Sequence, residues 1–148
     1  NAGRSAGLRL NYSAGPLMAE LAYSDTDGFG ATRDHKSTVG GVSYDFGVAK
    51  AFAQYGQVKF EDKATDFGKD KFFQIGAIVP VTAAGSVHVS YGQNKGDGFK
   101  DQAFTLAYNH NLSKRTGVYA GFERVKVKED GLGSDSANTF VVGARHAF

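Results

Sequence analysis

The chain of 148 residues contains no cysteine, no tryptophan and only two prolines. Without cysteine it can form neither a disulfide framework nor a thiolate metal site. No stretch approaches the roughly 18 consecutive apolar residues that a transmembrane helix requires. The longest apolar run, IGAIVPV at 75–81, is much shorter and contains Pro80. The formal net charge is +2 and the basic residues are scattered, so the charge pattern predicts no nucleic-acid partner.

Glycine and aromatic residues are abundant, with 20 Gly, 12 Phe and 7 Tyr. Disordered segments have few aromatics and a high net charge, so this composition predicts a folded chain. Apolar and polar residues alternate with a period of two in nine segments, which predicts β-strands with one apolar and one polar face. No segment keeps the apolar spacing of an amphipathic helix. The predicted strands cover residues 6–12, 17–24, 37–46, 48–59, 71–80, 86–94, 102–110, 116–127 and 138–148.

Two kinds of connection alternate between these segments. One kind is short, and the other is long, polar and rich in glycine and aspartate. Strict alternation predicts an antiparallel up-and-down meander with all tight turns at one end, which is the layout of a transmembrane β-barrel. The short connections are predicted at 14–16, 45–47, 82–85 and 112–115, and the long ones at 25–36, 61–70, 94–101 and 129–137.

The two faces of the predicted strands differ in charge. One face is aliphatic and aromatic, whereas the other mixes charged residues with glycine. In a small soluble barrel such as a lipocalin, the apolar face would point inward and the charged face outward. In a membrane barrel the apolar face contacts lipid and the polar face lines the lumen. The near absence of charge on the apolar face favours the membrane barrel, with candidate pore-lining residues Arg9, Glu20, Lys50, Glu123 and Arg145.

Aromatic residues are predicted near the strand ends of the apolar face. Aromatic rings prefer the headgroup level of a bilayer, where they form the girdles of membrane barrels. Their good fit to β-strands explains their abundance but not their end positions. The residues concerned are Tyr12, Tyr23, Tyr44, Phe46, Tyr55, Tyr91, Tyr108, Phe122 and Phe148.

Several segments resemble the general porins of Gram-negative outer membranes, in particular the betaproteobacterial branch. They are NYSAGPLMAELAY, YDFGVAKAFAQYGQVK, VPVTAAGSVHVSYGQ, YNHNLSKRTGVYAGFERV and the terminal VVGARHAF. The resemblance implies a passive diffusion channel for small hydrophilic solutes and ions, formed by a homotrimer in the outer membrane of a Gram-negative bacterium. It implies contact with the lipid bilayer and lipopolysaccharide. An adhesin or structural protein on a small outer-membrane barrel is the alternative.

The resemblance also implies a role for the alternating C-terminal strand. In the family, the C-terminal aromatic residue belongs to a signal read by the barrel-assembly machinery, and the last strand closes the barrel against the first. The corresponding residues are Phe140, Val142, Ala144, His146 and Phe148. The family barrel has sixteen strands, whereas nine are predicted here. We therefore expect residues 1–148 to be the C-terminal part of a single porin barrel domain, with its first and last strands unpaired.

No residue pattern predicts catalysis, a cofactor or a metal site. DTDG at 25–28 lacks the spacing of a calcium loop, and GFGATR at 28–33 lacks the strand–helix context of a phosphate-binding loop. The serines have no nucleophile motif. We therefore expect no enzyme activity. The histidines also lack the spacing of metal ligands; they are His35, His88, His110 and His146.

The predicted lining suggests a wide and weakly selective pore. Its three permanent cations against two carboxylates predict a mild anion preference, although a solvated lining without a selective role is the alternative. The resemblance implies that the main constriction belongs to the N-terminal half of the barrel. Small residues on the polar face suit a wide channel, and the glycines concerned are Gly7, Gly41, Gly56, Gly76, Gly92, Gly121 and Gly143.

Overall fold

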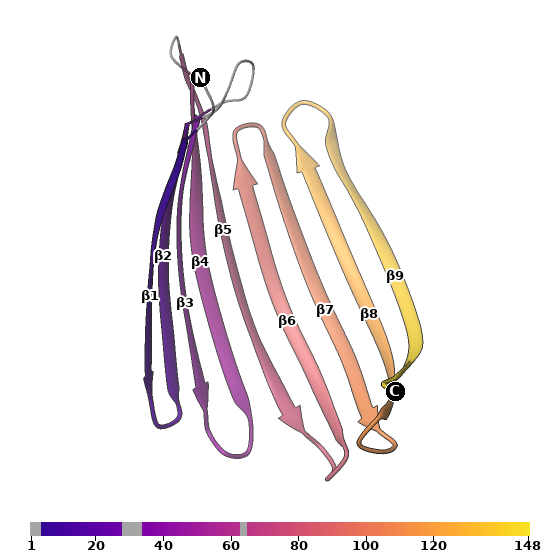
Figure 1. The fold of residues 1–148 in the computed structure, drawn as a ribbon. Helices are drawn as coiled ribbons and strands as arrows, with labels where there is room; N and C mark the ends of the chain where they lie inside the picture. Colours follow the sequence, from indigo (N-terminus) through magenta and orange to yellow (C-terminus); the bar gives the residue numbers. More distant parts are fainter. Residues whose placement is uncertain (1–3, 28–33, 63–64) are drawn as a thin grey trace.

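The computed structural model describes residues 4–27, 34–62 and 65–148, which form one antiparallel sheet of nine strands in chain order (Figure 1). The predicted all-β, up-and-down topology is therefore confirmed. No helix long and apolar enough to cross a membrane occurs in the described residues. The strands are β1 (Arg4–Ala14), β2 (Leu17–Asp27), β3 (Asp34–Asp45), β4 (Lys50–Asp62), β5 (Thr65–Pro80), β6 (Gly85–Gly96), β7 (Phe99–Asn111), β8 (Thr116–Glu129) and β9 (Gly133–His146).

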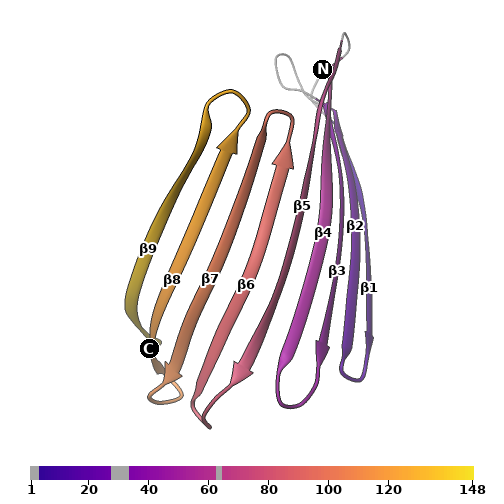
Figure 2. The ribbon, with the colours of Figure 1, turned by 180° about the vertical axis from the view of Figure 1, so that it is seen from behind.

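The sheet is a single curved layer, in which β1–β4 are seen edge-on while β5–β9 are seen from the face (Figures 1 and 2). No hydrophobic residue is buried among those that the structure describes. Large apolar side chains are instead exposed, for example Leu8 at 63% and Val142 at 82%. Burial of apolar surface is the main stabilising contribution in folding, so this sheet needs an apolar environment around it.

The register confirms the two faces predicted from the period of two. On one face, aliphatic and aromatic residues lie directly opposite one another, as in the series Val89, Leu106 and Phe122. We call this the outer face. On the other, Glu20, Gly41 and Gln54 follow one another across β2, β3 and β4. We call this the inner face. A shift of one residue would exchange the two faces in any strand, so the contrast between lipid and water selects this register.

The four predicted tight turns lie together at one end of the sheet. The strands leave residues 15–16, 46–49, 81–84 and 112–115 between them. In the turn after β3, Gly47 has a positive φ of 81°, and its amide donates to the Asp45 carboxylate at 2.8 Å. Glycine adopts this backbone conformation without a steric penalty.

The prediction of long loops at 94–101 and 129–137 is wrong. Strands β6 and β7 continue to a two-residue turn at 97–98, and β8 and β9 continue to residues 130–132. Polar side chains do not prevent strand pairing where the strands stand in water, and Gly98, with φ 80°, permits the tight turn. In the predicted loops 25–36 and 61–70, the described residues 25–27, 34–36, 61–62 and 65–70 belong to strands. Their remaining parts, 28–33 and 63–64, lie outside the described residues.

Strands β1 and β9 form the two edges of the sheet and do not pair with each other. They lie at opposite sides of the layer in both ribbon views (Figures 1 and 2). The prediction that the first and last strands remain unpaired is therefore confirmed. Each edge presents unpaired backbone N–H and C=O groups, which hydrocarbon does not tolerate.

Candidate pore lining

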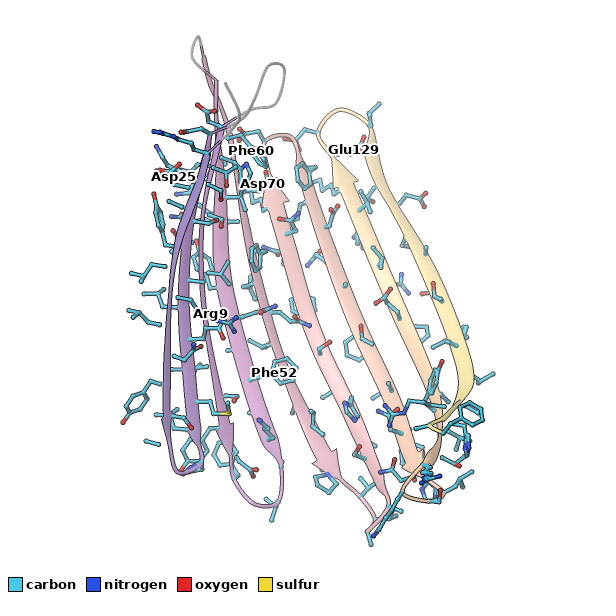
Figure 3. All side chains as sticks on the ribbon, in the orientation of Figure 1. Arg9, Asp25, Phe52, Phe60, Asp70 and Glu129 are labelled. Carbon is cyan, nitrogen blue, oxygen red and sulfur yellow. The ribbon has the colours of Figure 1, made fainter. Side chains whose placement is uncertain are left out.

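The inner face forms a groove over the first four strands. Side chains that line it include Arg9, Met18, Glu20, Phe52 and Gln54. Arg9 projects from β1 toward the side of the sheet on which β5–β9 lie, whereas Asp25 projects from the other side (Figure 3). The groove therefore belongs to the face that was predicted to line a pore.

Arg9 and Glu20 form an ion pair on this face, at 2.5 Å between Nη2 and Oε2. Their side chains are 65% and 43% exposed, so water screens the pair and its contribution to stability is small. Two strands further, the Gln54 amide donates to the Gln74 side-chain oxygen at 2.8 Å. These cross-strand contacts hold polar groups in place along the inner face.

The remaining three pore-lining candidates lie apart from one another on the sheet. Lys50 lies directly opposite Asp45, next to the turn between β3 and β4. Glu123 on β8 accepts a hydrogen bond from the Thr105 hydroxyl at 3.2 Å. Arg145 on β9 borders a small hollow near the opposite edge of the sheet, together with Asn109 and Tyr119. The register thus distributes these charges over the inner face.

Sequence reasoning missed most of the carboxylates on the inner face. Alternation along each strand and the register between strands place these carboxylates on the same face as Thr105 and Glu123. The predicted cation excess is therefore wrong for the described part of this face, where carboxylates outnumber cations. Most were missed because their segments were read as loops, in which alternation has no meaning. The additional carboxylates are Asp45, Asp70, Asp101, Glu129 and Asp135.

Aromatic rings cover three inner-face glycines. Phe52 lies over Gly76, Phe72 over Gly56 and Tyr119 over Gly143, each from the directly opposite position of the neighbouring strand. A Cβ at any of these glycines would collide with the ring. The lining is therefore less open than the glycine content suggested, because rings folded across the strands occupy part of the space.

Seven of the nine predicted aromatic residues lie on outer-face strands, some of them in mid-strand, whereas Phe46 lies in the turn after β3 and Phe148 beyond the end of β9. Tyr55 and Tyr91 lie in the middle of β4 and β6 because these strands continue beyond the predicted ends. Tyr91 packs against Phe73, with ring centroids 5.9 Å apart. Phe104 lies opposite Tyr91 and extends this row of rings to β7. The rings mark a boundary between apolar and charged residues on the outer face.

The C-terminal alternation lies on the outer face of β9. Phe140 is 77% exposed at the sheet edge and packs on Phe122, with ring centroids 5.0 Å apart. His146 Nδ1 lies 2.9 Å from the Thr116 hydroxyl. The ring of Phe148, beyond the end of β9, meets the His146 ring edge-on at 5.0 Å. The described residues contain no group of three potential metal ligands.

Comparison with known proteins agrees with this geometry. Residues 1–130 match the Gram-negative porin family. The chain is 34% identical to outer membrane porin protein 32 of Delftia acidovorans, covering 99% of this chain and 47% of that protein. Among solved structures, outer-membrane-expressed OmpT of Vibrio cholerae superposes with a TM-score of 0.80 at 15% identity, covering 97% of this chain and 56% of that one. In-vitro folded OmpT of the same organism gives a TM-score of 0.73 at 13% identity, covering 97% of this chain and 55% of that one.

The chain spans about half the length of these relatives. The likeness to OmpT concerns the fold alone, because the sequences share little identity. The family match covers most of the sequence and agrees with a sheet whose outer face is apolar and whose inner face is charged. The outer membrane is therefore the location of this protein, and the chain belongs to the Gram-negative porin family.

Proposed function

We propose that this chain is the C-terminal part of a single larger porin barrel domain, which forms a passive diffusion channel for small hydrophilic solutes and ions. Membership of the porin family supports a channel rather than an enzyme. The two unpaired edge strands support a larger barrel, and so does the 47% coverage of the Delftia porin. Additional strands between β9 and β1 would close the sheet around the inner face.

The observation that carries this proposal is the contrast between the faces. The outer face bears exposed Leu8, Leu10 and Leu21, whereas the inner face bears the Arg9–Glu20 ion pair and the Gln54–Gln74 hydrogen bond. An apolar exterior and a hydrated, charged interior are what a water-filled membrane barrel requires. An adhesin or structural protein on a small barrel is the alternative function.

Planar-bilayer recording of the full-length protein tests the channel. We expect stepwise conductance increases as molecules insert. Insertion verified by protease protection, without any conductance, would exclude the channel and favour the adhesin or structural alternative. Hydrolytic activity toward lipid or peptide substrates would contradict the non-enzymatic proposal.

The inner-face charges predict the effect of this part of the barrel on ion selectivity. Carboxylates lining a pore favour cations and basic residues favour anions. Asp70→Asn combined with Asp101→Asn is expected to move the reversal potential toward anion preference in a salt gradient. Lys50→Gln combined with Arg145→Gln is expected to move it in the opposite direction. If neither double variant changes the reversal potential, these residues line the pore without contributing to its ion selectivity.

We also propose that the alternating end of β9 acts as an assembly signal, from Phe140 to the exposed Phe148. Phe148→Ala is expected to lower the amount of protein inserted into the outer membrane of cells while leaving refolding in detergent unchanged. Equal insertion of the variant would rule the signal out. A homotrimer is proposed from the family resemblance, and its mass in neutral detergent is the measurement that checks it.

A further inference from the structure

Strand β3 presents two small residues to the inner face, between longer side chains of β2 and β4. Gly41 lies directly opposite Glu20 on one side and Gln54 on the other. Ser43 is the next residue of β3 on the same face. Strands β2 and β4 stand about 9.6 Å apart across β3, so a furrow about one small molecule wide runs over these two residues. We call it the β3 groove, and it is lined by Met18, Glu20, Gly41, Ser43, Phe52 and Gln54, together with Arg9 of β1.

The β3 groove has a charged end and an apolar end. At the charged end, one guanidinium nitrogen of Arg9 donates to one carboxylate oxygen of Glu20, and both side chains are well exposed to water. At the other end, Met18 and Phe52 face each other across Ser43. Phe52 lies closer than Arg9 to the tight turns (Figure 3). The two ends are two residues apart along a strand, which is about 6.6 Å.

The apolar end of the groove lies on the face that the charged residues share. Met18 is 51% exposed there, and the Phe52 ring lies over Gly76 and lines the groove. Apolar side chains in a water-filled lumen gain free energy only when an apolar group displaces the water beside them. The groove has a volume of about 480 Å³, which suits a small molecule. These properties favour a small solute with one charged end and one apolar end.

We propose that the β3 groove binds α-amino acids with an apolar side chain on their way through the pore, an inference that rests on the proposed channel function. The carboxylate of the solute pairs with the Arg9 guanidinium, and its ammonium group pairs with the Glu20 carboxylate. The side chain of the solute lies along β3 between Met18 and Phe52.

The ion pair explains why the solute is a zwitterion. A solute with a negative charge alone is repelled by Glu20, and a solute with a positive charge alone is repelled by Arg9. Adjacent opposite charges in one molecule satisfy both side chains. Because water reaches the ion pair, binding is weak enough for the solute to leave the groove again, as passage through a channel requires.

Calorimetric binding of L-phenylalanine to the full-length protein in neutral detergent tests the class of ligand. Phenylpropionate lacks the ammonium group and phenethylamine lacks the carboxylate. Each is expected to bind about tenfold more weakly than phenylalanine, because one charged hydrogen bond is lost. Glycine lacks the apolar side chain and is also expected to bind about tenfold more weakly. Equal affinity for all four solutes, or no binding of phenylalanine, would overturn the proposal.

The variant Glu20→Gln separates recognition of the ammonium group from a structural role of the ion pair. It leaves the Arg9 guanidinium without its carboxylate, so Arg9 then attracts an anion and repels an ammonium group. We expect this variant to bind phenylpropionate more tightly than phenylalanine, which reverses the order found for the unaltered protein. A purely structural effect would weaken both solutes to the same extent. An unchanged order of affinities therefore contradicts the role of Glu20.

Gly41→Val fills the floor of the groove and is expected to abolish phenylalanine binding without lowering the melting temperature. A Cβ at Gly41 would meet the Ala53 carbonyl oxygen at an ordinary 3.7 Å, and valine suits a β-strand. Gly92→Val is the matched control. Gly92 lies on the inner face of β6 opposite Gln74, and its Cβ would meet the Phe73 carbonyl oxygen at an ordinary 3.5 Å. The control should retain full binding, and equal affinity of the two variants would refute the site.

Conductance in planar bilayers separates the failure of this proposal from the failure of the channel proposal. Binding in detergent does not require a conducting pore, so the two measurements are independent. Stepwise conductance without phenylalanine binding would overturn the groove and leave the channel in place. Phenylalanine binding with the expected variant effects, but without conductance, would support the groove as a binding site and exclude the channel.

Discussion

Replacement of Leu106 by arginine is expected to lower the free energy of unfolding by about 2–4 kcal/mol in lipid vesicles. Leu106 lies on the outer face of β7, directly opposite Val89 and Phe122. Two rings, Phe104 and Tyr108, flank its position on the same strand and face. An arginine there must either enter hydrocarbon or distort the surrounding bilayer, and both cost free energy. Urea unfolding of the full-length protein in phospholipid vesicles measures the change.

The adjacent residue provides the control. Thr105 lies on the inner face, opposite Ser90 and Glu123, so Thr105→Arg places the new cation in the water-filled interior beside a carboxylate. We expect its effect on unfolding to stay within about 0.5 kcal/mol, as for ordinary surface substitutions. The two variants introduce the same side chain one residue apart. Equal destabilisation by both would contradict the assignment of inner and outer faces.

Gly76→Ala is expected to destabilise the barrel by about 1–3 kcal/mol, the usual cost of overpacking a well-filled site. A Cβ at this position would lie 2.7 Å from the Val89 carbonyl oxygen, which belongs to the neighbouring backbone. The Phe52 ring blocks the remaining space. The ring can rotate away, but the carbonyl cannot move without disturbing the β5–β6 pairing. The same unfolding measurement in vesicles detects the loss.

Gly41→Ala is the matched control for this glycine. Gly41 also lies on the inner face in the middle of a strand, but its Cβ would meet the Ala53 carbonyl oxygen at 3.7 Å, an ordinary contact. Alanine restricts the unfolded chain more than glycine does, so this variant should be neutral or more stable by up to about 1 kcal/mol. If Gly76→Ala unfolds like Gly41→Ala, the close approach of the Val89 carbonyl oxygen to this position is wrong.

The topology, and the face of each residue inside the apolar band, followed from local sequence alone. Leu106 and Thr105 could be assigned to opposite faces from the alternation of their segment, because side chains in a strand alternate with a strict period of two. The tight turns at 112–115 and elsewhere were equally predictable from their composition. These features depend on neighbours in the chain, and local sequence carries that information.

The strand extensions were not predictable from local pattern. Residues 94–101 are rich in glycine, lysine and aspartate, a composition that is typical of loops. The structure continues β6 and β7 through them because backbone hydrogen bonding persists where both faces meet water. The error hid Asp101 from the inner face and gave the wrong charge balance. It also placed Tyr91 near a strand end.

The register between strands determined which residues of different strands became neighbours. Phe52 and Gly76 are distant in sequence, and only the pairing of β4 with β5 puts the ring over the glycine. In the same way, Lys71, Lys95, Lys100 and Lys128 looked like scattered charges until three successive pairings aligned them. Alternation sets the face of a residue within its own strand. Which residues become neighbours depends on the register between strands, and that register is a property of the assembled sheet.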